Sequence, residues 1–180
     1  MSGALARAGR NEHATEANAI DAALIARYRK VQEVRDACDL LAGLGNSVGP
    51  SALLVIDEAL RDPRTPVRAA ARALRLATGP EIDLWLSAAI ASDADPGVRA
   101  DAIFAAGFHR PLGLRLVDAL LQVARGDSVD YVRSNAITLL RRNSDASPDI
   151  ARTLAWVAIN DPKPGIRRLA GERLGTSTSR

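Results

Sequence analysis

Apolar residues recur at intervals of three or four positions in four separate stretches of this chain. These stretches span residues 51–60, 81–90, 114–124 and 149–159. In the second stretch, Ile82, Trp85, Leu86 and Ile90 would share one face of an α-helix. No stretch shows the alternation of apolar and polar β-branched residues that marks a half-buried strand. The hydrophobic pattern therefore predicts an all-α fold.

A second pattern follows each of these helices and repeats along the chain. The copies read DPRTPVRAAARAL, DADPGVRADAIFA, DSVDYVRSNAITL and DPKPGIRRLAGER. In every copy an arginine stands six residues after an aspartate, a β-branched residue precedes it, and an alanine follows three residues later. Successive arginines are separated by 31, 34 and 34 residues. A repeat of this length is typical of stacked helical hairpins, in which each unit buries its apolar face against the next.

The repeated phrase predicts a turn followed by the second helix of each unit. Proline or glycine just before the pair of β-branched residue and arginine suits the start of a helix. The β-branched residue and the alanine would face the interior, where small side chains let helices approach closely. The aspartate would accept backbone N–H groups in the turn and cap the next helix. The constant spacing lets each arginine reach an aspartate of its own or of a neighbouring unit, so we expect a structural ladder of Asp62, Arg68, Asp93, Arg99, Asp127, Arg133, Asp161 and Arg167.

A weaker copy of the phrase precedes the others. Val34 and Arg35 keep the pair, and Cys38 takes the place of the small residue. Together the copies predict a right-handed α–α superhelix of about four to five helix pairs. We expect one repeat domain over residues 15–175, with a disordered N-terminus at 1–14 and a disordered tail at 176–180.

These residues resemble HEAT repeats. The resemblance rests on paired helices with an aspartate in the turn, a Val-Arg pair at the start of the second helix and an alanine three residues later; it covers residues 50–175 well and 15–49 less well. It implies an α-solenoid whose second helices line a concave face. HEAT-repeat proteins mostly bind other macromolecules, and the resemblance implies no catalytic residue.

Composition changes this picture little. The formal net charge is +3 and the sequence pI is about 9.6, yet only Lys30 and Lys163 are lysines. The abundance of arginine is explained either by GC-rich codon usage or by contacts to phosphate or carboxylate groups. The mean hydropathy is -0.04, and no apolar run approaches the roughly 20 residues that span a bilayer. We expect a cytosolic protein without a membrane segment.

No residue pattern indicates an active site. His13 and His109 are expected in polar surface segments, and Cys38, the single cysteine, is expected to pack. Phosphate-binding glycine loops are absent from the sequence. The acidic residues Asp57, Glu58 and Asp62 are more simply explained as solvated helix faces and caps. The sequence therefore predicts a protein that is not an enzyme and that needs neither cofactor nor metal.

The side of each second helix opposite the Val and Ala positions is the candidate partner surface. It offers an apolar centre with arginines around it, which suits a peptide or helix. Some of these residues would instead pack against a neighbouring helix. Trp156 is a further candidate, since the equivalent positions of other units hold Asp57, Ala88 and Gln122. The predicted concave-face residues are Arg72, Leu76, Ile103, Phe104, Ile137, Arg141 and Arg168.

Three functions remain open from the sequence. The first is a non-enzymatic scaffold module that presents its concave face to a protein or peptide partner. The second is a nucleic-acid-binding protein, which the arginine content favours. The third is an accessory subunit of a lyase-type enzyme, as found among HEAT-like bilin lyases.

Overall fold

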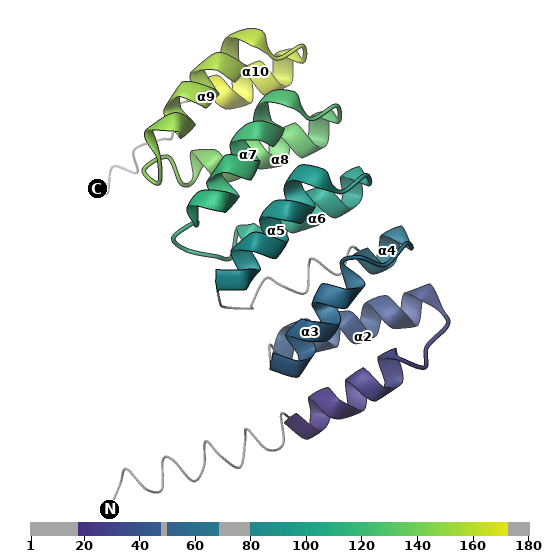
Figure 1. Cartoon of the computed structure of the whole chain (residues 1–180). Helices are drawn as coiled ribbons and strands as arrows, with labels where there is room; N and C mark the ends of the chain where they lie inside the picture. The colour runs from purple at the N-terminus through teal and green to yellow at the C-terminus, as the bar shows by residue number, and fades with distance from the viewer. Residues whose placement is uncertain (1–17, 48–49, 69–79, 173–180) are drawn as a thin grey trace, which may run out of the picture. The chain divides into compact units, whose positions relative to one another are not determined.

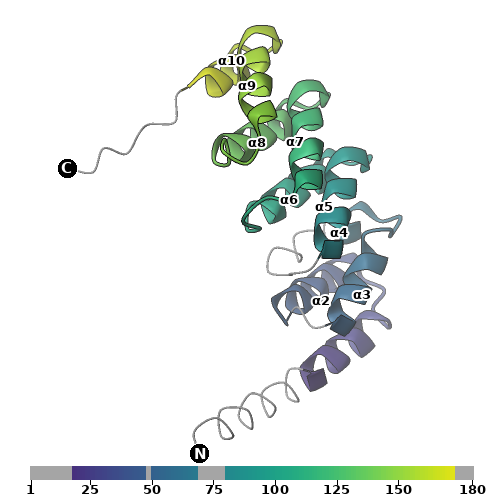
Figure 2. The same cartoon turned by 60° about the vertical axis from the view of Figure 1, so that its left-hand side comes forward.

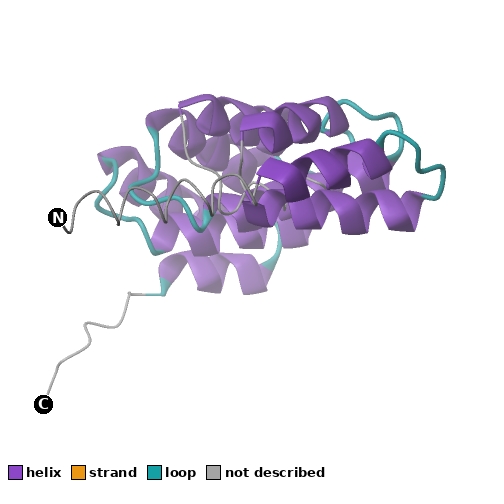
Figure 3. Ribbon diagram, turned by 90° about the horizontal axis from the view of Figure 1, so that it is seen from below, coloured by secondary structure: helices purple, strands orange, loops and turns teal. Residues whose placement is uncertain are grey.

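The computed structural model describes residues 18–47, 50–68 and 80–172. The chain divides into two compact units, Met1–Thr78 and Gly79–Arg180, which are considered separately below. Every regular element within the described residues is a helix (Figure 3), which confirms the predicted all-α class. The predicted end segments 1–14 and 176–180 lie outside the described residues, and the single domain over 15–175 stays a prediction.

Within the described residues, the N-terminal unit packs three helices and one short helical turn around an apolar interior. Residues 18–28 are helical, and α2 (Val34–Ser47), α3 (Pro50–Ala59) and α4 (Thr65–Arg68) follow. Its core residues are Ala37, Leu40, Leu41, Leu44, Ala52, Val55, Ile56, Ala59 and Val67. The Cys38 thiol on α2 donates to the Pro66 carbonyl oxygen at 3.0 Å, and burial raises the pKa of this thiol. Both observations favour a packing role for this cysteine over a reactive one.

The C-terminal unit consists of helix pairs arranged in two layers. The pairs are α5 (Pro80–Ser92) with α6 (Pro96–Ala106), α7 (Leu114–Gly126) with α8 (Asp130–Arg141), and α9 (Pro148–Asn160) with α10 (Pro164–Gly171). The first helices α5, α7 and α9 lie side by side, and α6, α8 and α10 form the second layer (Figures 1 and 2). Within this unit the repeated phrase of the sequence therefore corresponds to a repeated structural pair.

The core of the C-terminal unit contains the β-branched residue and the alanine of each repeated copy. The β-branched residues Val98, Val132 and Ile166 are buried, at 5% exposure or less. The alanines that follow, Ala102, Ala136 and Ala170, are buried at the same helix face. First helices contribute larger side chains, among them Ile82, Leu86, Leu116, Leu120 and Ile150, each at 0% exposure. The small alanines of the second layer, packed among large aliphatic side chains of both layers, let successive pairs pack closely.

Two arginine–aspartate pairs join successive helix pairs of this unit. Arg99 donates from Nε and Nη2 to the two carboxylate oxygens of Asp127, at 2.7 and 2.8 Å. Arg133 makes the same bidentate contact with Asp161, at 2.7 and 3.1 Å. All four side chains are at most 11% exposed. Each arginine thus binds the aspartate in the turn of the next helix pair through two parallel hydrogen bonds in the plane of its guanidinium.

The third nitrogen of each arginine holds the turn of its own pair. Arg99 Nη1 donates to the Asp93 carbonyl oxygen at 2.9 Å, and Arg133 Nη1 donates to that of Asp127 at 2.8 Å. Arg167 repeats this bond to Asp161 O at 2.7 Å, as does Arg68 to Asp62 O at 3.1 Å in the N-terminal unit. The guanidinium groups of Arg99 and Arg133 therefore each hold the turn of their own helix pair through Nη1. Through Nε and Nη2 they hold the turn of the next pair.

The aspartates brace the turn and do not cap the second helix, which corrects the capping role expected from sequence. The carboxylates of Asp93, Asp127 and Asp161 each accept the backbone N–H two residues later, at 2.8–2.9 Å. Helix α6 is capped by a different residue, Asp95, and α8 and α10 have no side-chain cap bond. The reason is position, since each repeated aspartate lies three residues before its helix begins.

The acidity of these aspartates reflects the same bonds. Burial by itself raises the pKa of Asp127, but the Arg99 guanidinium, the Val129 N–H and the charge of Arg133 together bring it below its ordinary value. The pKa of Asp161 is lowered against burial in the same way, by Arg133, the Lys163 N–H and Arg167. Both groups stay ionised in the folded protein to lower pH than in the unfolded chain.

Removing one partner of a buried pair should destabilise the protein strongly. Arg133→Met keeps the aliphatic bulk but leaves Asp161 buried without its cation, so we expect a loss of about 3 kcal/mol in the free energy of unfolding. The control is Arg152→Met, which breaks an exposed pair with Asp149 and should cost about 0.5 kcal/mol or less. Urea unfolding followed by circular dichroism measures both; equal losses would contradict the role of the buried pair.

Acid should remove this stabilisation in a defined pH range. Because the folded pKa of Asp127 and Asp161 lies below the unfolded value of about 3.9, their contribution is complete above that value and disappears as pH falls through the folded pKa. The variant Arg99→Met/Asp127→Leu lacks one pair, so its urea midpoint should fall less than that of the wild type between about pH 5 and pH 2. Parallel falls in the two proteins would be inconsistent with this linkage.

Candidate functional site

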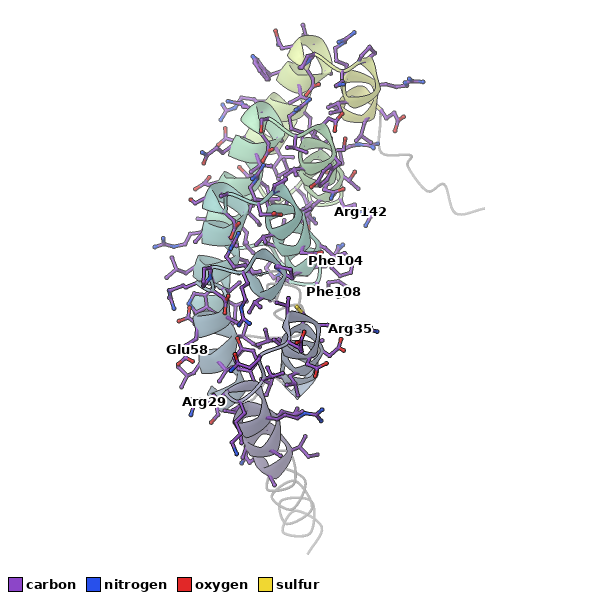
Figure 4. All side chains as sticks on the ribbon, turned by 90° about the vertical axis from the view of Figure 1, so that its right-hand side faces the viewer. Arg29, Arg35, Glu58, Phe104, Phe108 and Arg142 are labelled. Atoms are coloured by element: carbon purple, nitrogen blue, oxygen red, sulfur yellow. The ribbon has the colours of Figure 1, made fainter. Side chains whose placement is uncertain are left out.

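A groove of about 420 Å³ lies between α6 and α8 in the C-terminal unit. Both helices belong to the second layer, the side from which the sequence predicts partner binding. The residues that line the groove come from one face of each helix and from the residues just after each helix. They are Ile103, Phe104, Gly107, Phe108, Asn135, Thr138, Leu139 and Arg142. Figure 4 shows Phe104, Phe108 and Arg142 pointing outwards on the same side of the unit.

Two aromatic rings form the apolar part of the groove. The rings of Phe104 and Phe108 meet edge to face, with centroids 5.2 Å apart. They are 45% and 53% exposed, although burial of a phenylalanine side chain is favourable by about 2 kcal/mol. Gly107 lies between them in sequence, and a Cβ there would come within 3.1 Å of Phe104 O and 3.7 Å of Leu139 Cδ1. Because Gly107 has no side chain, the space between the rings and Leu139 of α8 stays unfilled at this position.

The polar part of the groove comes from α8 and the residue that follows it. Asn135 and Arg142 are exposed and Thr138 is half-buried, so amide, hydroxyl and guanidinium groups border the rings. No carboxylate among residues 18–47, 50–68 and 80–172 pairs with Arg142. A ligand with an apolar side chain and a nearby carboxylate would match both parts of this surface.

The structure places the predicted α6 residues Ile103 and Phe104 at the groove, but it moves the predicted α8 surface by about one residue. The sequence places Ile103 and Ile137 at an exposed apolar centre, but they are only 3% and 0% exposed. On α8 the groove residues are Asn135, Thr138 and Arg142, next to the predicted Ile137 and Arg141. A shift of one residue rotates the face by about 100°. The physical reason is that α8 is covered on two sides, by the first-helix layer and by its neighbours α6 and α10.

Arg141 is also corrected, because it binds within the chain. Its guanidinium contacts Glu172 through Oε2 at 3.3 Å and through the carbonyl oxygen at 3.1 Å, and the side chain is only 14% exposed. Phe104 is the predicted residue that the groove does expose, and Arg168 lies exposed on α10. Arg72 and Leu76 lie outside the described residues.

Trp156 on α9 is 45% exposed and stands outside the groove. The Arg125 guanidinium of α7 lies 5.9 Å from the centre of its ring, within the range of a cation–π contact. The structure thus gives this tryptophan a neighbour within the chain. Its role as an anchor for a partner stays a prediction.

Many of the arginines contact carboxylates of the same chain. Besides the two buried pairs, Arg61 contacts Asp57, Arg64 contacts Asp62, and Arg152 contacts Asp149. A carboxylate that neutralises an arginine reduces its attraction for phosphate. The arginine content therefore gives less support to nucleic-acid binding than the sequence alone suggests, and the same pairs account for Asp57 and Asp62.

The described part of the chain offers no metal site and no membrane-spanning helix. No group of three or more His, Cys, Asp or Glu residues there could hold a metal ion. None of the helices in that part is both long and apolar enough to cross a membrane. His109 lies in the turn between α6 and α7, and His13 falls outside the described residues.

Comparison with known proteins gives a fold and no family. No protein-family model matches this chain. A search of curated proteins also finds no match. Among solved structures, the fold is similar to a chain from the complex of CpcE and CpcF of phycocyanin lyase from Nostoc sp. PCC7120, with a TM-score of 0.65 and 22% identity. The match covers 84% of this chain and 96% of that chain. At this identity the similarity establishes a shared helical solenoid-like fold.

Proposed function

We propose that this chain is a HEAT-like protein-binding subunit that holds a segment of a partner protein in the α6–α8 groove. The observation that carries the proposal is the exposed pair of Phe104 and Phe108 beside Arg142. Aromatic rings and an arginine at the centre of a groove are the residue types that dominate binding energy at protein interfaces. The repeated Asp, Val-Arg and Ala positions support the HEAT-like assignment.

The binding would serve a lyase-type enzyme, in which this chain acts as an accessory subunit. The similar solved structure supports this, because it is a phycocyanin lyase and a complex of two different proteins. This chain spans nearly the full length of the matched chain, so the similarity extends beyond an isolated repeat. In this proposal the chain contributes recognition of the partner through its groove.

A photo-crosslinking residue placed in the groove should capture the partner. We expect benzoylphenylalanine at position 108 to crosslink a discrete protein in extracts of the source cells, identified by mass spectrometry. Arg142→Glu in the same chain should lower the yield about tenfold or more, because a like charge would face the partner's carboxylate.

The control places the same crosslinker at position 159 on α9, where Ile159 is 77% exposed but lies outside the groove. Capture of the same proteins with equal yield at both positions would contradict binding in the groove. Circular dichroism of each variant checks that the fold is retained.

The accessory role is tested with the captured partner. Lyase activity should be measured for this chain, for the partner and for the two together, first with phycocyanin, the protein named with the similar lyase. We expect activity only from the combination, and Phe108→Ser should reduce it through weaker assembly. Full activity of the partner alone would exclude an accessory role while leaving binding in the groove intact.

A further inference from the structure

The N-terminal unit has a groove of its own, of about 620 Å³, between the helix at 18–28 and α3. Ile25, Leu54 and Val55 form its apolar floor, and Asp21, Arg29 and Glu58 supply its charges. Figure 4 shows Arg29 and Glu58 pointing out on the same side of this unit. The groove is separate from the α6–α8 groove and does not depend on the function proposed for it.

Asp21 is the unusual group in this groove. It is only 4% exposed, and its Oδ1 atom is buried without a hydrogen-bond partner among the residues that the structure describes. A buried carboxylate oxygen without a donor costs the protein the desolvation of that oxygen with no return. Native proteins satisfy nearly all such groups, so this carboxylate in the groove is a candidate to accept a hydrogen bond from a ligand.

The charged neighbours of Asp21 do not supply the missing donor. Arg29 lies in the turn just after this helix, eight residues and about 12 Å beyond Asp21, and no hydrogen bond joins it to Asp21 Oδ1. Glu58 adds a second, exposed carboxylate on α3. A metal ion is a poor match, since the described residues offer no group of three ligands. The groove therefore presents a negative site above an apolar floor.

We propose that this groove binds a lysine or arginine side chain carried by a helical segment of a partner protein. The cationic group would donate to the Asp21 carboxylate, and apolar side chains one turn away would cover Ile25 and Leu54. The shape fits, because two neighbouring helices leave a groove into which a third helix packs. The lining residues extend from Asn18 to Arg29, about 16 Å or three helical turns. The 65% exposure of Leu54 leaves apolar surface for the partner to cover.

The first test uses butylguanidinium as a probe of the cationic site. Titration followed by the backbone amide signals of Ile25 and Val55 should show saturable binding to the wild-type full chain. Asp21→Asn should weaken it about tenfold or more, as expected for loss of a charged hydrogen bond. The matched control, Asp36→Asn, removes an exposed carboxylate of α2 and should bind like the wild type. Equal affinity of Asp21→Asn and the wild type, or no binding to either, would overturn the proposal.

The second test asks whether a helical segment is the ligand. An alanine-rich helical peptide with one arginine and two leucines one turn away should bind about tenfold more tightly than butylguanidinium, because it also covers the floor. A peptide with glutamate in place of the arginine should not bind. If the arginine peptide binds no better than butylguanidinium, the groove takes a free cation and the segment is overturned. If Arg7→Ala/Arg10→Ala increases probe affinity, the chain's own N-terminal residues fill the groove and the partner is overturned.

Stability distinguishes a binding residue from a structural one. Because Asp21 is buried with an oxygen that accepts no hydrogen bond, Asp21→Asn should raise the urea midpoint of the free protein, as substitutions at binding sites often do. Asp36→Asn should leave it unchanged. A lower midpoint for Asp21→Asn would mean that the carboxylate is already satisfied within the fold, and would overturn the proposal.

Discussion

The bidentate bond between an arginine and the aspartate of the next helix pair organises the C-terminal unit. A helix pair packed only by Ala, Val and Leu would tolerate sliding, because apolar contacts have no direction. The bonds of Arg99 to Asp127 and of Arg133 to Asp161 do have direction, and the four side chains are nearly inaccessible to solvent. Each arginine also holds its own turn through Nη1. These hydrogen bonds therefore set the position of one helix pair relative to the next. Apolar side chains pack in the space between the two pairs.

This arrangement leaves the rest of each second helix available for recognition. The buried faces of α6 and α8 hold alanines, larger aliphatic residues and the arginine, whereas Phe104 on α6, and Phe108 and Arg142 just after the two helices, border the groove. Phe104 is held by α6, and Phe108 and Arg142 directly follow α6 and α8, so in the proposed binding mode little conformational entropy would be lost in ordering the groove. The N-terminal unit uses its helices in a different way, with a groove on the side of the helix at 18–28 and α3, floored by aliphatic residues.

Much of the fold could be predicted from the sequence, because the repeated phrase is in phase with the helices. Val98, Val132 and Ile166 are buried as their period indicates. The spacing of six residues between aspartate and arginine could not decide between a bond within the pair and one to the next pair. The structure contains both, since a guanidinium has two edges and the aspartate offers a carbonyl and a carboxylate. Periodicity also could not reveal the orphaned oxygen of Asp21, which depends on the packing of a helix outside the clear repeats.

The partner surface was harder to predict than the core, since an inner helix of a stack is covered on more than one side. Ile137 looks exposed on a helical wheel and is buried, whereas Arg142 lies just past the end of α8 and borders the groove.

The most direct test of the organising bond is a double-mutant cycle on Arg99 and Asp127, with Arg99→Met, Asp127→Leu and both together, measured by urea unfolding at neutral pH. A coupling free energy of about 2 kcal/mol is expected. A coupling within about 0.3 kcal/mol of zero would contradict it, because additive sites do not share a bond.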